Sequence, residues 1–386
     1  MSEAVSLLQQ LVRIPSVNPA CLSGSPTPAG APAPGEGPLV DFLEQWLGEA
    51  GLATRRQTAL PGRDNLLALV PGRRPGGLLL EAHLDTQGPA GMSHAPFSGA
   101  LAEGRVWGRG ACDTKAGMAA MLVALRRAAA EGPPTGALLA LVVDEEYQFA
   151  GIERLVADLP PGPWRGAVVG EPTGLQVVNR HGGAVRLRCE LRGRAAHSSH
   201  PEQGENAIYH ALRLVEAVRG YHERLRRRPV ADPQVPPSCT VTLIEGGEAI
   251  NVVPEHCVVS LDRRLHPWEE PPAVQAELLA LAAEAVGEAP LHCEVLLLDA
   301  PLAPRPDSAL AALCLEAVRE VGGPGELGGV AYGTDASNLA RAGLDAVVLG
   351  PGDIQQAHAA EEWVETDQVE RAAEVYYRLL TRAQEL

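Results

Sequence analysis

The stretch LLLEAHLDTQG, residues 78–88, begins as a continuous apolar run and ends with two ionisable side chains, His83 and Asp85. Such a run predicts a buried strand of a parallel sheet, because these strands are covered on both faces. Alternate side chains of an extended chain share a face, so His83 and Asp85 point the same way. Two interpretations follow: a histidine that ends the sheet beside an acid that pairs with it, or a metal ligand followed by its supporting carboxylate.

Strands and helices alternate on both sides of this stretch. The predicted strands are residues 65–70, 136–146 and 166–172, and the predicted helices are residues 4–13, 39–51 and 118–132. This alternation indicates an α/β domain with a mostly parallel central sheet flanked by helices. The Pro/Gly/Ala-rich segment 19–38 predicts a loop.

From residue 182 the pattern changes to alternating strands. We expect strands at residues 184–193, 239–247, 256–265 and 291–299, with helices at residues 205–228 and 271–287. The order βαββαβ predicts a small two-layer sandwich. A chain of 386 residues also exceeds the size at which single cores stop growing. We therefore expect a catalytic domain of residues 1–181 and 300–386, with residues 182–299 inserted as a lid or dimerisation domain.

Composition limits the classes of partner. A formal charge of −16 argues against a broad surface for nucleic acid or anionic membrane. The sequence contains no apolar stretch of membrane-spanning length, and its first residues do not resemble a secretory signal. The seven cysteines form no CxxC pair, which is typical of reduced thiols. We expect a cytoplasmic protein without nucleic-acid or membrane partners.

Ionisable residues follow the ends of several predicted strands. They are His83 and Asp85, Asp113, the run Asp144–Glu146, Glu171 and His358. The carboxyl ends of parallel strands meet at one sheet edge, so these side chains can converge. Two histidines and at least three carboxylates suit Zn²⁺, Co²⁺ or Mn²⁺. For any one acid, the alternative is an ordinary polar loop.

An ordered set of motifs runs from LVRIPSVNP to HAAEEWV, almost the whole chain. Between these ends are HLDT, GRGACDTKAG, DEE, GEPT, GRAAHSSHPEQGENAI, NVVP, LDRR, GTDA and GPG. The set resembles the metal-dependent amidohydrolases that include acetylornithine deacetylase, succinyl-diaminopimelate desuccinylase, aminoacylase and carboxypeptidase G.

The resemblance implies a centre of two divalent ions, with Zn²⁺ expected and Co²⁺ or Mn²⁺ as alternatives. Its implied ligands are His83 and Glu171 for one ion, Glu146 and His358 for the other, and Asp113 as the bridge. Asp85 would support His83. Glu145 would be the general base that takes a proton from water and passes it to the departing amine.

The resemblance also assigns roles to the inserted domain and to the GTDA motif. It implies a homodimer in which His197 of one subunit donates to the oxyanion formed in the other subunit's site. Arg264 would pair with the substrate carboxylate, whereas the adjacent Arg263 is expected to point the other way, into solvent. Asn251, Gly333 and Thr334 are interpreted either as substrate contacts or as turn residues that stabilise their own loops.

The predicted function is hydrolysis of the amide bond of N-acyl amino acids, as in acetylornithine deacetylase. The alternatives with the same chemistry are a dipeptidase or carboxypeptidase, which would take a dipeptide or peptide, and a desuccinylase. A non-catalytic binding protein is the alternative from another class. The adjacent acids Glu145 and Glu146 argue against it, because one can bind metal while the other moves a proton.

Overall fold

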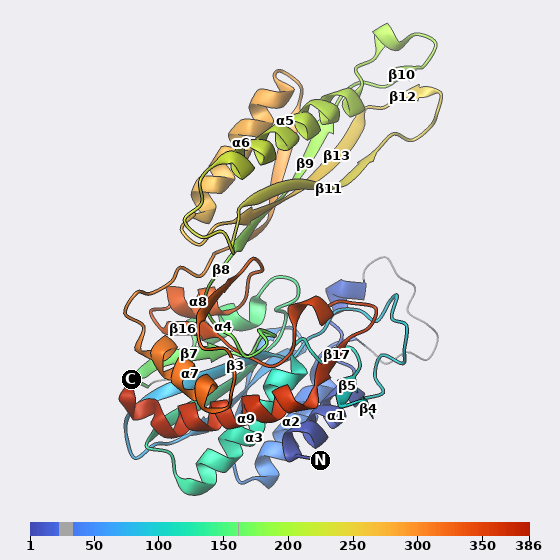
Figure 1. Cartoon of the computed structure of the whole chain (residues 1–386). Coiled ribbons are helices and arrows are strands. Elements are labelled where there is room, and N and C mark those ends of the chain that lie inside the picture. Colours follow the sequence, from blue (N-terminus) through green and yellow to red (C-terminus); the bar gives the residue numbers. More distant parts are fainter. Residues whose placement is uncertain (23–33, 161) are drawn as a thin grey trace. The chain divides into compact units, whose positions relative to one another are not determined.

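The computed structural model describes residues 1–22, 34–160 and 162–386, which form two compact units (Figure 1). The larger unit consists of Met1–Asn179, Arg305–Gly328 and Thr334–Leu386, and the inserted unit consists of Arg180–Pro304 and Gly329–Gly333. The predicted loop 19–38 begins with a short 3₁₀ helix, Pro19–Leu22. Its residues 23–33 lie outside the described residues.

The sheet of the larger unit is parallel at its centre and antiparallel at its edges. Its strands lie in the order β1 (Thr54–Leu60), β2 (Arg63–Val70), β6 (Thr135–Val142), β3 (Arg74–His83), β7 (Trp164–Val169), β16 (Asp345–Val348), β8 (Val177–His181) and β15 (Leu327–Val330). The four strands β6, β3, β7 and β16 are parallel neighbours. The predicted fold class is therefore confirmed, since the continuous apolar runs form the buried parallel strands.

Helices cover both faces of this sheet. One face carries α1 (Glu3–Arg13), α2 (Gly37–Glu49), α3 (Lys115–Glu131), α7 (Ala309–Glu320) and α9 (Thr366–Arg382), and the other carries α4 (Ala150–Ala157) and α8 (Ala336–Arg341). Helices α3 and α9 pack side by side across the central strands and contribute much of the apolar core. No helix in the described part of the chain has the length and hydropathy needed to cross a membrane.

Strand β1 was not predicted, because its sequence TRRQTAL has no apolar run. It forms at the sheet edge by antiparallel pairing with β2, where Arg55 and Arg56 are exposed. A separate small sheet, also unpredicted, contains β4 (Ala100–Ala102), β5 (Arg105–Trp107) and β17 (Trp363–Glu365). Short edge strands of this kind depend on their partners, so they leave little periodic signal in the sequence.

The inserted unit has the predicted βαββαβ order. Its main elements are β9 (Gly183–Arg192), α5 (Ala207–Arg227), β11 (Ser238–Gly246), β13 (His256–Leu265), α6 (Pro271–Val286) and β14 (Leu291–Asp299). The strands form an antiparallel sheet in the order β11-β13-β9-β14, and both helices pack on one face of it. A two-residue ribbon pairs β10 (Ala196–His197) with β12 (Val252–Val253).

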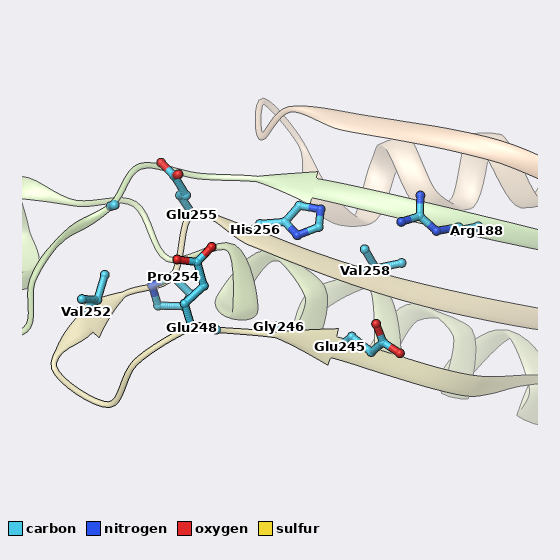
Figure 2. A pocket seen from close by; sticks show the side chains of 11 residues that line it. Arg188, Glu245, Gly246, Glu248, Val252, Pro254, Glu255, His256 and Val258 are labelled. Carbon is cyan, nitrogen blue, oxygen red and sulfur yellow. The ribbon is translucent and has the colours of Figure 1, made fainter. Parts of the chain in front are cut away.

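The face of this sheet opposite the helices carries a pocket of about 260 Å³ (Figure 2). Arg188 and His256 line it together with three acids, Glu245, Glu248 and Glu255. None of the described residues that line this pocket is a predicted metal ligand or substrate contact.

The expectation that Arg263 is solvated is wrong, because its side chain is fully buried on the helix-covered face. Its guanidinium donates to the Tyr221 hydroxyl (3.2 Å), to the Glu269 carboxylate (2.5 Å) and to the carbonyl of Arg264. Alternation does place Arg263 and Arg264 on opposite faces. The expectation failed because it placed Arg263 on the solvent-exposed face of the strand, and Arg263 lies on the buried face. The core accommodates its long side chain because the N–H groups of the guanidinium have hydrogen-bond partners.

We predict that Arg263→Met lowers the free energy of unfolding of the inserted unit by about 3 kcal/mol, because Glu269 and the Tyr221 hydroxyl lose a buried partner. Denaturant unfolding followed by circular dichroism measures this loss. The matched control is Arg264→Met, whose half-exposed side chain pairs with Asp262 and is worth at most about 1 kcal/mol. Equal loss in the two variants would contradict a structural role for Arg263.

Candidate metal centre

The predicted ligands of the larger unit come from loops at one edge of the parallel sheet. His83 is the last residue of β3, Glu171 follows β7 by two residues, and Glu146 follows β6 by four. Asp113 lies just before α3, whose Gly117 packs against the carbonyl of Gly170, where a Cβ atom would collide. This close packing sets the Asp113 segment beside the loop that carries Glu171.

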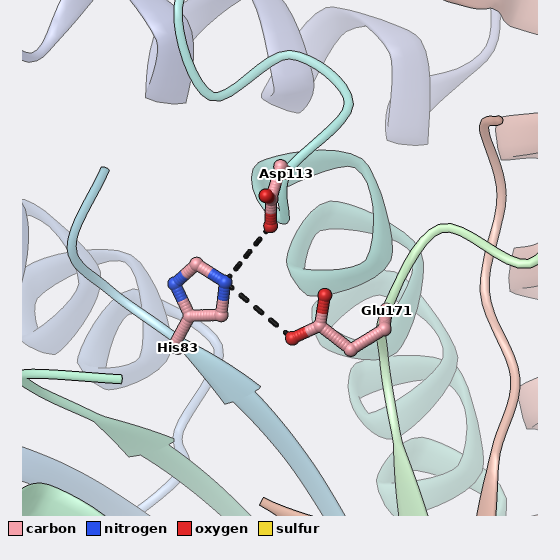
Figure 3. Close-up of side chains that lie close together, drawn as sticks. All are labelled: His83, Asp113 and Glu171. Carbon is pink, nitrogen blue, oxygen red and sulfur yellow. Dashed lines mark hydrogen bonds and ion pairs between the residues drawn. The ribbon is translucent and has the colours of Figure 1, made fainter. Parts of the chain in front are cut away.

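His83, Asp113 and Glu171 form one group of converging side chains (Figure 3). The Nε2 atom of His83 lies 3.0 Å from Oδ1 of Asp113 and 3.4 Å from Oε1 of Glu171. All three residues are buried. Figure 3 shows both carboxylates directed at the same ring nitrogen.

Asp113, Glu146 and His358 form a second group that shares Asp113 with the first. The Nε2 atom of His358 lies 3.2 Å from Oδ2 of Asp113 and 3.0 Å from Oε1 of Glu146. Asp113 thus presents one carboxylate oxygen to each histidine. In each group the ligand atoms lie within 4.8 Å of one another, a spacing that a single cation can span.

The electrostatics of the two groups favour cations. Burial raises the pKa of Glu171 and of Glu145 well above their usual values, and neighbouring carboxylates add to the effect. Burial alone would lower the pKa of His358, but hydrogen bonds with Asp113 and Glu146 raise it to about 10. Burial alone would also lower the pKa of His83, but the charge of Glu171 and the hydrogen bond with Asp113 raise it well above its usual value. The raised pKa values of the acids come from burial and from neighbouring carboxylates, whereas those of the histidines come from the carboxylates and oppose the effect of burial. An excess of buried carboxylates around two histidines is a donor set that fits divalent ions.

Asp85 holds the acidic loop as well as its histidine neighbour. The main-chain carbonyl of Asp85 lies 2.9 Å from Nδ1 of His83, which leaves Nε2 of that ring facing the other ligands. The carboxylate of Asp85 accepts the backbone N–H groups of Glu145 and Glu146, both at 3.1 Å, and the amide of Asn18 at 2.8 Å. The Oδ1 atom of Asp85 lies 3.7 Å from Nδ1 of His83, farther than the main-chain carbonyl oxygen of Asp85. One aspartate therefore links the first histidine to the double acid.

Sequence reasoning missed several residues that support this centre. Asn18 and Arg63 bond the carboxylate of the buried Asp144, and Arg63 also pairs with the buried Glu36. Asn18 lies within the LVRIPSVNP motif, so it could have been noticed. Arg63 follows a turn without any motif and gives no sequence signal.

Two further residues contact the predicted ligands or their backbone. The amide of Gln87 donates to Oε2 of Glu146 at 3.0 Å. The buried carboxylate of Glu362 accepts the N–H of Asp113 at 3.2 Å and pairs with Arg109 at 2.6 Å. Glu362 is the second acid of the HAAEEWV motif, and this doubling was a signal that sequence reasoning did not use.

Three other predicted residues belong to the inserted unit. His197 is exposed on β10, and its Nδ1 lies 2.8 Å from the Ser199 hydroxyl. Asn251 precedes β12, and its carbonyl accepts the N–H of Ser198. Arg264 donates from Nε to Asp262 at 2.8 Å and keeps 37% of its side chain exposed.

Gly333 and Thr334 have local structural roles in the GTDA motif. A Cβ atom at Gly333 would collide with the carboxylate of Asp299, so a larger residue at this position would have to displace that side chain. The hydroxyl of buried Thr334 accepts the N–H of Ala336 at 3.2 Å at the start of α8. Thr334 therefore stabilises its own loop, whereas Gly333 lies against Asp299 at the end of β14.

We predict that Asp85→Asn weakens divalent-metal binding about 10- to 100-fold, because an amide offers one acceptor oxygen where the two carboxylate oxygens accept three N–H groups. Competition with a chelating dye measures the affinity. Asp41→Asn is the matched control, since Asp41 is exposed on α2. Identical affinities in the two variants would contradict a supporting role for Asp85.

Comparison with known proteins identifies the family. The model of the peptidase family M20/M25/M40 matches residues 79–382. An acetylornithine deacetylase from Myxococcus xanthus is 32% identical over 356 residues, covering 88% of this chain and 90% of the relative. A protein described as a probable carboxypeptidase from Aspergillus clavatus is 29% identical, covering 89% and 82% of the two chains.

The fold is also that of solved structures. The M20 family metallo-carboxypeptidase from Sulfolobus solfataricus superposes with a TM-score of 0.81 over the full length of both chains, at 18% identity. The resemblance predicted from the motifs is thereby confirmed. The chain belongs to the peptidase family M20/M25/M40 and is a metal-dependent hydrolase of amide bonds.

Proposed function

We propose that this chain is a two-metal hydrolase that cleaves the amide bond of N-acyl amino acids, with a substrate class like that of acetylornithine deacetylase. The observation that carries the proposal is the position of Asp113, with one oxygen toward His83 and the other toward His358. A carboxylate in this position suits a bridge between two ions. The acetylornithine deacetylase relative, similar over almost its full length, supports the substrate class.

His83 and Glu171 would hold one ion, Glu146 and His358 the other, and Asp113 both. We expect Zn²⁺, because mixed nitrogen and oxygen ligands suit it, with Co²⁺ or Mn²⁺ as alternatives. When bound, such ions lower the pKa of water and polarise the substrate's carbonyl group.

Glu145 is the proposed general base. Its backbone N–H is held by Asp85, and its neighbour Glu146 belongs to the second ligand group. This arrangement leaves Glu145 beside the ligands without being one of them. Glu145 takes a proton from the attacking water and then donates it to the nitrogen of the departing amine.

Substrate recognition is assigned to the inserted unit. The half-exposed guanidinium of Arg264 suits a substrate carboxylate, because two N–H groups can bind it in a bidentate manner. His197 would donate to the oxyanion that forms on the carbonyl oxygen. Asn251, Gly333 and Thr334 would act mainly by holding the loops around these groups.

A homodimer is part of the proposal, with His197 acting in the partner's site. Strand β11 is an edge of the inserted sheet and carries the exposed side chains of Leu243 and Ile244. The neighbouring helix α5 exposes Tyr209 and Leu212. An unpaired edge beside apolar side chains favours association with a second copy.

We also propose a cytoplasmic location, in keeping with seven free cysteines.

The second candidate function is a carboxypeptidase or dipeptidase, which the Aspergillus relative supports. A desuccinylase would differ from the first proposal only in the acyl group. All of these enzymes use the same centre and require a free substrate carboxylate to face Arg264. Substrate assays therefore have to distinguish them.

We predict that the protein loaded with Zn²⁺ or Co²⁺ releases amine from N-acetyl amino acids and that a chelator abolishes this release. The assay compares N-acetyl, N-succinyl and longer-acyl amino acids with dipeptides. Glu145→Gln is the control variant and should retain metal while losing activity by about 10²- to 10⁴-fold. Cleavage of dipeptides alone would assign the peptidase function, and inactivity of a metal-loaded dimer on every compound would favour a binding protein.

We predict that two inactive variants, Glu145→Ala and His197→Ala, recover activity when their subunits are exchanged. A mixed dimer then has one site with both residues intact. Random pairing should restore about one quarter of wild-type activity, because half of the dimers are mixed and half of their sites are complete. Exchange is verified by native mass spectrometry of differently tagged subunits. Absence of recovery in verified mixed dimers would contradict a shared site.

A further inference from the structure

Two cysteines of the inserted unit face each other across neighbouring strands. Cys189 lies on β9 and Cys293 on β14, and the two residues are direct cross-strand partners. Their Sγ atoms are 2.9 Å apart, although the residues are 104 positions apart in the sequence. Both thiols point toward the helix-covered core.

The backbone geometry at this pair permits a covalent bond. Directly opposed residues of antiparallel strands have Cα atoms about 4.5 to 5.5 Å apart. Disulfides occur at Cα separations of about 4.4 to 6.8 Å. No rearrangement of the two strands is therefore needed to bring the sulfur atoms within bonding reach.

The two thiols differ in a way that suits stepwise oxidation. Cys293 is only partly buried, on the edge strand β14, whereas Cys189 is fully buried on the central strand β9. The hydrogen bond between the two thiols lowers the pKa of Cys293, and this bond together with burial raises the pKa of Cys189. An oxidant thus reaches Cys293 first, and Cys189 is already in place to react with the product.

We propose that Cys189 and Cys293 form a reversible disulfide when the protein is exposed to a peroxide. The Cys293 thiolate attacks a peroxide oxygen, giving a sulfenic acid as the O–O bond breaks. The sulfur of Cys189 then displaces the hydroxyl group as water. Two thiols lose two electrons and two protons, and one molecule of hydrogen peroxide becomes two molecules of water.

The bond joins the central strand β9 to the edge strand β14 and closes a loop that contains α5, β11, β13 and α6. It therefore links the first and last strands of the inserted unit. A dithiol reverses it by exchange, since cross-strand disulfides within reach of solvent are the more readily reduced ones. The pair is remote from β11, the edge proposed for dimerisation, because β14 is the opposite edge of the sheet.

The experiment counts thiols of the full-length protein before and after hydrogen peroxide. Denatured samples are alkylated with N-ethylmaleimide and measured by intact mass, and peptides are mapped without reduction. We expect the wild type to lose two of its seven alkylation sites through one crosslink between the peptides of Cys189 and Cys293. Dithiothreitol should restore both sites.

Matched variants separate this pair from general oxidation. Cys293→Ser should form no such crosslink, whereas Cys257→Ser should form it as the wild type does. Cys257 faces the same core, but its cross-strand partners are Leu191 and Gly246 rather than cysteines. Glu145→Gln should also form the crosslink, which makes the result independent of the proposed catalytic function.

Two results would overturn the proposal. One is the absence of the crosslink in wild-type protein whose partly exposed Cys21 has been oxidised, since the oxidant was then present and effective. The other is an unchanged loss of two alkylation sites in Cys293→Ser. The peptide map of the wild type decides the question even if a serine variant fails to fold.

Discussion

The convergence of carboxylates at one edge of a parallel sheet is the constraint on which the site depends. Asp113, Glu146 and Glu171 point their oxygen atoms at two histidine rings within a few ångströms of one another. Such a cluster is unfavourable unless positive charge lies among its members, because buried carboxylates repel each other and lose their hydration.

Hydrogen bonds and ion pairs from surrounding residues keep this cluster in place. Asp85 holds the loop of Glu145 and Glu146, Glu362 holds the backbone of Asp113, and Arg63 pairs with both Asp144 and Glu36.

Much of the larger unit could be predicted from local patterns. Continuous apolar runs identified the parallel strands, and polar residues at the ends of β3 and β7 identified the site edge, because strand direction alone determines where those side chains gather. Local patterns could not pair His358 with Glu146, which are 212 positions apart, and only the ordered set of motifs made that connection. Arg63 escaped prediction for a related reason, since its partners Glu36 and Asp144 lie far from it in the sequence. Strand β1 pairs with the adjacent strand β2 but has no apolar run to mark it.

The inserted unit shows what strand alternation can and cannot provide. Alternation correctly separated Arg263 from Arg264, but it did not reveal that the buried face holds Arg263, since Tyr221 and Glu269 lie on other elements. Cys189 and Cys293 likewise lie opposite each other because of the register in which β9 pairs with β14. The hydrophobic patterns of two separate strands do not determine that register by themselves. Contacts between residues on different strands and helices were therefore the hardest to predict from the sequence.

The number of divalent ions bound per chain tests the central claim most directly. Metal-free protein would be titrated with Zn²⁺, dialysed, and analysed by inductively coupled plasma mass spectrometry beside the variant Glu171→Gln. Two ions per chain are expected for the wild type, and about one for the variant, because Glu171 belongs to only one ligand group. A single ion per wild-type chain at saturation would contradict a two-metal centre bridged by Asp113.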